Sequence, residues 1–257
     1  MIMKTAHLDK DELMRHAANR MDTELAGHSR SLRETVALTC NILFRHGHDS
    51  GLAGQITALL PDGSGHYLTQ RLGLGFDEID VANLLVVDRD LNVIEGQGMP
   101  NPANRFHSWI YDRRPDVRCI VHTHPLHTSA LSMLGEPLAI AHMDSCMLYG
   151  EVAWLPEWPG VPVGNDEGKI ISEVLGGRKA ALLAHHGLVV AGSSVEEACV
   201  IAVQFERAAR LHLLARAAGE IKKIPDALAK EAHDWILTDR RSKALFDYYA
   251  RGLIRYG

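Results

Sequence analysis

Apolar residues recur at helical spacing in two stretches near the start of the chain, 9–21 and 29–45. The second stretch stops at Gly47, and glycine is favoured just beyond the end of a helix. Two short stretches follow, 54–59 and 66–70, on either side of a Pro-Asp-Gly turn sequence. The pattern therefore predicts two helices followed by a β-hairpin.

Short apolar runs, polar breaks and amphipathic stretches alternate through the rest of the chain. By period, length and flanking residues we expect strands over 84–87, 91–94, 117–123, 180–184 and 188–191, with one more just before the segment 141–150. Helices are expected over 102–113, 125–134, 166–175 and 193–218, with two more in 225–256. No internal repeat, linker or low-complexity stretch interrupts this order. The sequence therefore predicts a single domain over 1–257, an α/β sandwich in which helices cover a mostly antiparallel sheet.

Composition and charge limit the kinds of partner that we expect for this protein. The formal net charge is -5 and no run of Lys or Arg is longer than a pair, so we expect a small-molecule substrate and no nucleic acid. No apolar run approaches the roughly 20 residues that a membrane-spanning helix needs, so no membrane partner is expected. The start of the chain does not resemble a signal peptide, and none of the 4 cysteines forms a close pair. These features predict a cytoplasmic protein.

Histidine supplies the candidate chemistry. Side chains two residues apart on a strand point to the same face, so His122 and His124 can reach one metal ion from a strand end. A further ligand must come from elsewhere in the fold. The turn between two apolar strands holds the adjacent residues His185 and His186, which point in different directions, so only one of them is expected to bind. Two histidine clusters at the ends of apolar strands therefore predict a divalent-metal site.

Four segments of the chain resemble the class II aldolase/adducin family, which includes fuculose-phosphate aldolase. They are Arg105-Phe106-His107, Arg114-Pro115-Asp116, Val121-His122-Thr123-His124 and Leu183-Ala184-His185-His186-Gly187-Leu188. The resemblance implies a three-layer α/β/α fold with a central, mostly antiparallel sheet, a core over about 32–213 and a helical tail over 214–257. It also implies a homotetramer with sites at subunit interfaces. One divalent ion per chain would be held by His122, His124 and His186, with zinc expected first and manganese, cobalt or iron as alternatives, while His185 would be structural.

The chain also departs from the sugar-phosphate aldolases at positions that matter for chemistry. Their acid/base glutamate lies four residues before the position of His107, where this chain has Ala103. The hydroxyl-bearing pairs that hold the substrate phosphate in those enzymes align with Leu72-Gly73 and Asn101-Pro102, and a proton-donating tyrosine aligns near Met143. Because these hydroxyl donors are missing, we expect a substrate without a phosphate.

These comparisons lead to a hypothesis for the reaction. A metal-stabilised enolate would serve both decarboxylation and retro-aldol cleavage of a hydroxy or oxo acid, which could be aromatic. Retro-aldol cleavage needs a base for the substrate hydroxyl, so Ala103 favours decarboxylation. The candidate proton donors are His142, Asp144 and Tyr149. The candidate substrate-binding residues are Arg71 and Arg105, which would hold a carboxylate, together with Gly54 and Gln55 in the glycine loop.

Two further histidines have supporting roles in this interpretation. His107, on the helix before the metal strand, is expected to orient a metal ligand, and His127 to act as a supporting residue or helix cap.

Two alternative functions stay open. One is an iron(II)-dependent oxygenase on the same scaffold, because three histidines also bind Fe(II). The other is a non-catalytic interaction module like the adducin head domain, although the intact ligand positions argue against it.

Overall fold

An eight-stranded sheet lies at the centre of the computed structural model, which describes residues 7–25 and 27–256. The strands lie in the order β4-β3-β2-β1-β5-β8-β7-β6. The sheet is mostly antiparallel, as the sequence predicted, and only β6 pairs with β7 in parallel. The strands are β1 (Gln55–Leu59), β2 (Tyr67–Gln70), β3 (Leu84–Val87), β4 (Val93–Glu95), β5 (Cys119–Thr123), β6 (Val152–Leu155), β7 (Ala180–Leu183) and β8 (Gly187–Gly192).

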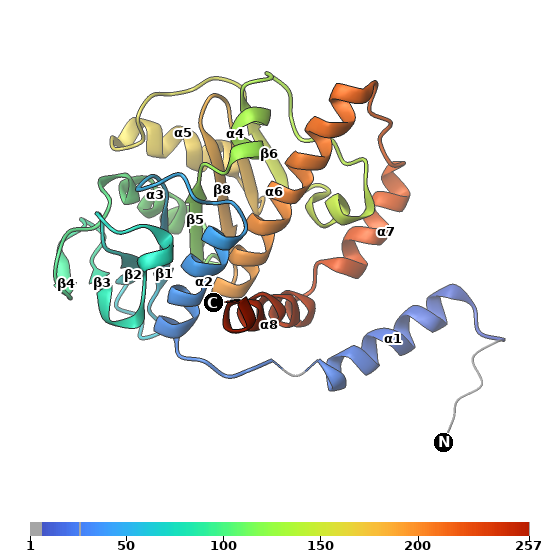
Figure 1. Cartoon of the computed structure of the whole chain (residues 1–257), viewed down its shortest axis with the longest axis horizontal. Coiled ribbons are helices and arrows are strands. Elements are labelled where there is room, and N and C mark those ends of the chain that lie inside the picture. Colours follow the sequence, from blue (N-terminus) through green and yellow to red (C-terminus); the bar gives the residue numbers. More distant parts are fainter. Residues whose placement is uncertain (1–6, 26, 257) are drawn as a thin grey trace.

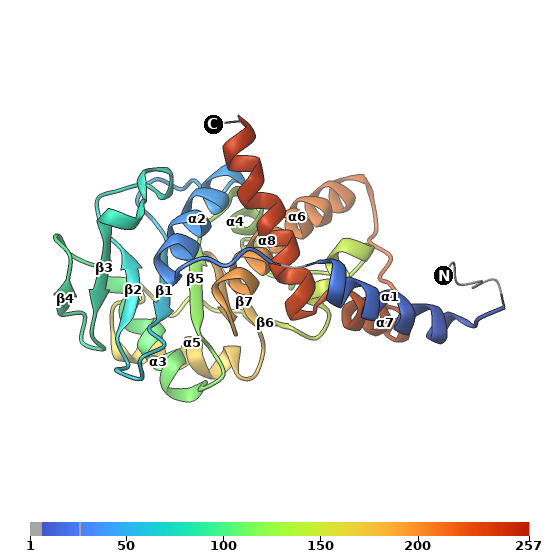
Figure 2. The same ribbon diagram turned by 90° about the horizontal axis from the view of Figure 1, so that it is seen from below.

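Helices surround the sheet and continue into the C-terminal tail (Figure 1). The α-helices are α1 (Lys10–Glu24), α2 (Leu32–Arg45), α3 (Arg105–Arg113), α4 (Leu126–Ser132), α5 (Asn165–Leu175), α6 (Val195–Ala218), α7 (Asp226–Ile236) and α8 (Asp239–Tyr256). Short 3-10 helices are η1 (Phe76–Glu78), η2 (Val81–Asn83), η3 (Pro102–Asn104) and η4 (Met143–Leu148). Helix α1 extends along one side of the molecule and has no fully buried residue (Figure 2).

Side chains of the central strands point alternately to the two faces of the sheet, so the hydrophobic core has two layers. Cys119 and Val121 of β5 join the cluster formed with α2, α6 and α8, whereas Ile120 joins a second cluster with α3 and α5. Successive side chains of a strand point to opposite faces, so the even-numbered residues of β5 all face α3 and α5. His122 shares this side, and its ring meets the edge of Phe106 from α3 at a centroid distance of 5.2 Å. The fold is thus the expected three-layer α/β/α arrangement.

The hairpin predicted around the Pro-Asp-Gly turn is confirmed by the register of β1 and β2, in which Leu59 pairs with Tyr67. On its other edge β1 pairs with β5, and Gln55 lies directly opposite His122. The hairpin therefore places the glycine loop, residues 51–54, beside the end of β5. This register positions the candidate substrate residues beside the candidate metal ligands.

The secondary structure differs from the expectation in three places. No strand precedes Ala141, because Ala139 donates its N–H to Nδ1 of His212 on α6 and Ile140 accepts from Ile224, so the segment runs across α6. The sequence reading also missed β6, a short edge strand. The helix expected over 102–113 begins as the 3-10 helix η3, and the α-helix starts at Arg105.

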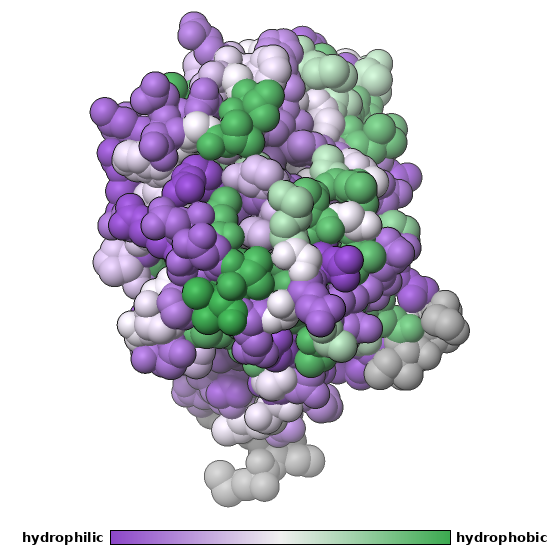
Figure 3. Space-filling view, turned by 90° about the vertical axis from the view of Figure 1, so that its left-hand side faces the viewer, coloured by the Kyte–Doolittle hydropathy of each residue, from purple (hydrophilic) through white to green (hydrophobic). Residues whose placement is uncertain are grey.

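The surface is chemically mixed. On the face that carries the β4 edge, apolar patches are separated by hydrophilic residues (Figure 3). Val93 and Ile94 of β4 contribute exposed apolar side chains. Within the described residues, no helix has the length and apolar character needed to cross a membrane.

Candidate metal centre

Three histidines come together where β5 and β7 end and β8 begins. His122 is the second-to-last residue of β5, and His124 directly follows that strand. His186 lies in the turn between β7 and β8. The register pairs Thr123 with Leu188 and closes the β7–β8 turn at Gly187. Sheet pairing therefore brings residues more than 60 positions apart in the chain to one point, since His122 donates to the carbonyl of Leu188 across a separation of 66 residues.

The geometry of the three imidazoles matches a metal-binding site. One nitrogen of each ring lies within 4.8 Å of the corresponding nitrogens of the other two. The Nε2 atoms of His122 and His124 are 2.9 Å apart. Among the described residues, no other group of three metal-ligating side chains converges in this way. Nitrogens at these separations can share one ion at metal–nitrogen distances of roughly 2.0–2.1 Å.

Hydrogen bonding selects the nitrogen that His122 offers. His122 donates Nδ1–H to the carbonyl of Leu188 at 2.9 Å, which leaves its Nε2 lone pair directed at the other two rings. A second partner of this kind is the usual way in which a metal-ligating histidine is oriented. The donor set, three imidazole nitrogens with no thiolate or carboxylate, fits zinc, manganese, cobalt or iron(II).

Burial keeps these imidazoles neutral. Burial lowers the pKa of His122 well below its ordinary value, and the neighbouring His124 and His186 lower it further. The pKa of His186 falls to about 4 through burial and the proximity of His124, and burial lowers the pKa of His124 too. Because a neutral imidazole is the ligand form, all three side chains are ready to bind an ion at neutral pH.

Two glycines let the backbone pack closely around the histidines. A Cβ at Gly187 would lie 2.5 Å from the carbonyl oxygen of Thr123 and 2.6 Å from Cδ2 of His124. A Cβ at Gly54 would lie 3.0 Å from the carbonyl oxygen of His122, and Gly54 has a φ of +106°. A larger residue at either position would push a neighbouring segment away from the site.

A buried polar layer lies on the same face as His122. Nδ1 of His107 is 2.8 Å from the hydroxyl of Thr57, which is also 2.9 Å from the Tyr111 hydroxyl. Burial lowers the pKa of His107 to about 3, so this ring is neutral. His107 was expected to orient a metal ligand, and this expectation was wrong, because its partner is Thr57 and Leu188 orients His122. Sequence reasoning gave no role to Thr57 or Tyr111, since their partners become visible only in the fold.

The candidate substrate residues are only partly brought together. Gln55 is buried beside His122, and its Nε2 has no hydrogen-bond partner among the described residues. Arg105, at the start of α3, forms an ion pair with Asp90 at 3.2 Å. The side chain of Arg71 lies against Gly98. Gln55 and Gly54 are therefore the predicted substrate residues that the fold positions beside the histidines.

The candidate proton donors lie on a different part of the molecule. His142 caps η4, Asp144 lies within it and Tyr149 follows it, and η4 packs mainly on α6 and α7. Asp144 accepts from Nε of Arg207 at 2.9 Å. The side chains of His142 and Asp144 are 55% and 39% exposed, so both are open to solvent.

Glu206 of α6 is a buried carboxylate that sequence reasoning missed. It accepts four hydrogen bonds at the start of α4, from the backbone N–H and Nδ1 of His127 and from the backbone N–H and hydroxyl of Thr128. His127 therefore takes part in a cap at the start of α4, but the capping side chain is Glu206. An isolated glutamate inside a long amphipathic helix carries no signal for this role.

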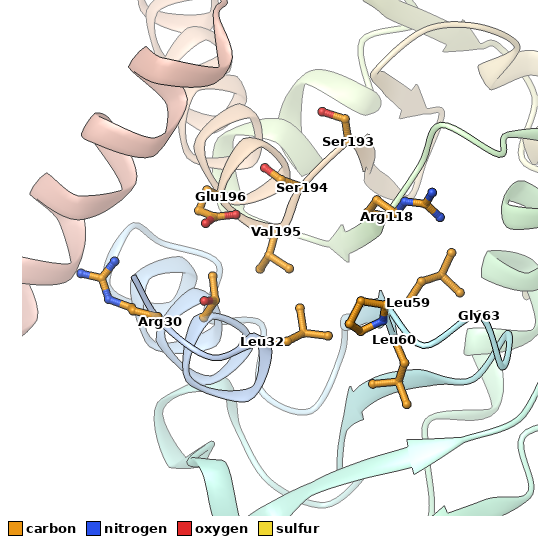
Figure 4. Close-up of a pocket in the computed structure, with 12 residues that line it drawn as sticks. Arg30, Leu32, Leu59, Leu60, Gly63, Arg118, Ser193, Ser194, Val195 and Glu196 are labelled. Carbon is orange, nitrogen blue, oxygen red and sulfur yellow. The ribbon is translucent and has the colours of Figure 1, made fainter. Parts of the chain in front are cut away.

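A cavity of about 550 Å³ lies between α2, the end of β1 and the start of α6 (Figure 4). Its wall includes Leu59, Arg118 and the start of α6. Arg118 directly precedes β5, whereas His124 directly follows it, so this cavity is separate from the metal centre. The first turn of α6 already contains the acidic residues Glu196 and Glu197, which complement the positive end of the helix.

A comparison with known protein families shows which family this chain belongs to. The profile of the class II aldolase and adducin N-terminal domain matches residues 34–213. The chain belongs to this family. Within the class II aldolase/adducin family, the solved structure of L-fuculose 1-phosphate aldolase from Glaciozyma antarctica is similar with a TM-score of 0.81 and 27% identity, covering 90% of this chain and 94% of that one.

Curated relatives include enzymes of more than one kind. The chain is 32% identical to decarboxylase NovR of Streptomyces niveus, over 80% of this chain and 77% of the relative. It is 31% identical to 4-hydroxy-3-prenylphenylpyruvate oxygenase/4-hydroxy-3-prenylbenzoate synthase of Streptomyces roseochromogenus subsp. oscitans, over 88% of this chain and 82% of the relative. Family membership and these relatives support an enzyme with class II aldolase-like or related chemistry.

Proposed function

We propose that this protein is a divalent-metal-dependent carbon–carbon lyase that acts on a non-phosphorylated hydroxy or oxo acid. The observation that carries the proposal is the convergence of His122, His124 and His186, with ligand nitrogens within 4.8 Å of one another. A bound divalent ion would act as a Lewis acid that stabilises negative charge developing on a substrate oxygen. Zinc is the first candidate, with manganese, cobalt and iron as alternatives.

The residue at position 103 favours decarboxylation over retro-aldol cleavage. Ala103 cannot take a proton from a substrate hydroxyl, which retro-aldol cleavage requires. Loss of carbon dioxide needs no such base. The bonding electron pair stays on the substrate, and a donor then delivers a proton to that carbon. The similarity to decarboxylase NovR agrees with this choice.

Substrate binding is assigned to the buried side of the site. The unpartnered Nε2 of Gln55 would donate to an oxygen of the substrate, beside the backbone of Gly54. A buried donor without a partner is costly, and a bound acid would satisfy it. Arg71 and Arg105 remain candidates for the carboxylate, although Arg105 must first leave Asp90.

The proton donor would come from a second copy of the chain. The family resemblance implies a homotetramer with sites at subunit interfaces, and the exposed side chains of His142 and Asp144 are candidates, together with Tyr149. In this arrangement η4 of one copy faces the histidines of its neighbour. Sedimentation of the full-length protein tests the assembly, and loss of activity in His142→Ala or Asp144→Asn tests the donor.

The reaction itself is tested with aromatic and aliphatic 2-oxo and 2-hydroxy acids. Metal-loaded protein is incubated with each acid without oxygen, and carbon dioxide and carbonyl products are measured. The proposal expects turnover under these conditions and none in His186→Ala. Turnover that stops without oxygen and consumes it when present would instead support an iron-dependent oxygenase, the second candidate function. The name of the second Streptomyces relative favours this alternative.

A further inference from the structure

A second cavity lies where α6 and α8 meet the loop after α2. It has a volume of about 750 Å³ and is enclosed by that loop, the start of α4, and faces of α6 and α8. Small-molecule sites have volumes of roughly 300–1,000 Å³, so a compact organic ligand would fit. None of the three metal-site histidines lines it. The cavity is therefore a separate binding space.

A histidine and a buried carboxylate face this cavity together. His127 and Glu206 both line it, and their side chains are 33% and 8% exposed. Nδ1 of His127 lies 2.6 Å from Oε1 of Glu206. Glu206 also accepts from the backbone N–H groups of His127 and Thr128, so its carboxylate acts as an acceptor and the proton is on Nδ1 of His127. Glu206 therefore fixes both the orientation and the tautomer of the imidazole.

The other ring nitrogen of His127 is left as an acceptor. A neutral imidazole with its proton on Nδ1 has a lone pair on Nε2. Within residues 7–25 and 27–256, Nε2 of His127 has no hydrogen-bond partner. Capping of α4 uses backbone N–H groups and the hydroxyl of Thr128, so it does not need this nitrogen. An imidazole that is oriented by a carboxylate in this way is suited to accept a hydrogen bond from a hydroxyl group.

The charges around the cavity balance, which favours an uncharged ligand. The charged residues of its wall are Arg45, Arg207, Arg210, Asp49 and Glu206. Arg207 also pairs through Nε with Asp144 of η4 at 2.9 Å. Three guanidinium groups are thus matched by three carboxylates. Neither an anion nor a cation gains from the summed charge of these groups.

The rest of the wall is flat and largely apolar. The rings of Tyr248 and Tyr249 are 5.6 Å apart, and the ring of His46 is 4.6 Å from that of Tyr249. Val203 and Leu245 add aliphatic surface. Aromatic rings pack favourably against other aromatic rings in offset or edge-to-face arrangements. This wall therefore suits a planar, apolar ligand body.

We propose that His127 and Glu206 form a second polar site, at which the cavity binds an uncharged planar ligand through a hydroxyl group, as in a phenol. The hydroxyl donates to Nε2 of His127, and the planar body lies against the tyrosine rings. This inference does not rest on the proposed lyase activity. It gives the free nitrogen of His127 a role that neither the metal centre nor the cap of α4 uses.

Isothermal titration of the full-length protein with 7-hydroxycoumarin tests the site, with coumarin as the planar ligand that lacks the hydroxyl. Because a hydroxyl can also bind at a metal ion, the titration is repeated on His186→Ala. The site variant is His127→Phe, which keeps a ring and removes Nε2. The matched control is His66→Phe, which changes a half-buried histidine just before β2, outside the cavity.

We expect 7-hydroxycoumarin to bind wild type and His186→Ala equally, and coumarin to bind both more weakly. His127→Phe should weaken 7-hydroxycoumarin binding roughly three- to tenfold, the loss expected for one hydrogen bond, while His66→Phe leaves it unchanged. Three results would overturn the proposal: no binding to His186→Ala, equal affinity for coumarin, or equal affinity in His127→Phe and His66→Phe. Circular dichroism checks the fold of each variant, and the coumarin comparison tests the proposal on the wild-type cavity alone.

Discussion

Nε2 of His122 lies 2.9 Å from Nε2 of His124, and the Nδ1–H of His122 is held by the carbonyl of Leu188. The pKa values of both rings are lowered, so these neutral rings can share either a proton, as a hydrogen bond, or a metal ion. Burial would penalise both rings if no cation or proton lay between them. The sheet therefore brings together two ligand nitrogens that one metal ion could share.

Metal content is the first prediction. Wild-type protein purified without chelator should contain about one divalent ion per chain, and His122→Ala and His186→Ala should contain none. His185→Asn serves as the control, because His185 has a φ of 55° that asparagine tolerates and the residue is not a predicted ligand. Elemental analysis measures all four proteins. Retention of the ion in His186→Ala would contradict the assignment of the ligands.

A second prediction concerns the close approach at Gly187. In Gly187→Ala, the new Cβ would meet the carbonyl oxygen of Thr123 at 2.5 Å and displace His124. We expect metal affinity to fall roughly 10- to 100-fold, as it does when the support of a ligand is lost. Gly177→Ala is the matched control, since nothing lies within 4 Å of its Cβ and its φ is not in the left-handed region. Competition with a fluorescent chelator gives both affinities, and equal values would refute the steric argument.

A third prediction follows from buried histidines in the metal-free protein. The pKa values of His48 and His107 are each lowered to about 3, mainly by burial, whereas an unfolded imidazole has a value of about 6.5. The unfolded chain therefore binds more protons between these values. Stability should be constant above about pH 6.5 and fall as pH drops below it, by roughly 1–2 kcal/mol per histidine at pH 5.

Urea unfolding of metal-stripped protein at pH 7.5 and pH 5 measures this dependence. His107→Gln removes one titrating ring and can keep a hydrogen bond to Thr57, so its stability should change less with pH than that of wild type. An identical pH dependence in both proteins would mean that His107 is not the neutral buried group described here.

A fourth prediction concerns the carboxylate of Glu206, which accepts four hydrogen bonds from His127 and Thr128 at the start of α4. In Glu206→Gln, one oxygen becomes an NH₂ group that faces hydrogen-bond donors, so the free energy of unfolding should fall by about 1–3 kcal/mol. Glu220→Gln, at an exposed position after α6, should be unaffected. Chemical denaturation compares the two, and equal stability would show that the cap contributes little.

The sequence by itself determined the layer architecture and most of the candidate metal site. Alternating apolar residues predicted the antiparallel hairpin of β1 and β2, and the His-x-His pattern at the end of β5 placed His122 and His124 on one face. These features are local, because strand periodicity and turn chemistry depend on neighbouring residues. The motif resemblance supplied His186, which spacing alone left undecided against His185.

Only the tertiary structure decided which distant groups act on one another. The carbonyl of Leu188 orients His122, Thr57 binds His107, and Glu206 caps α4, because strand register and helix packing bring them together. The short edge strand β6 was missed for a related reason, since a strand of four residues gains its hydrogen bonds from a partner far away in sequence. Contacts of this kind depend on the packing of the whole chain, and no local pattern records them.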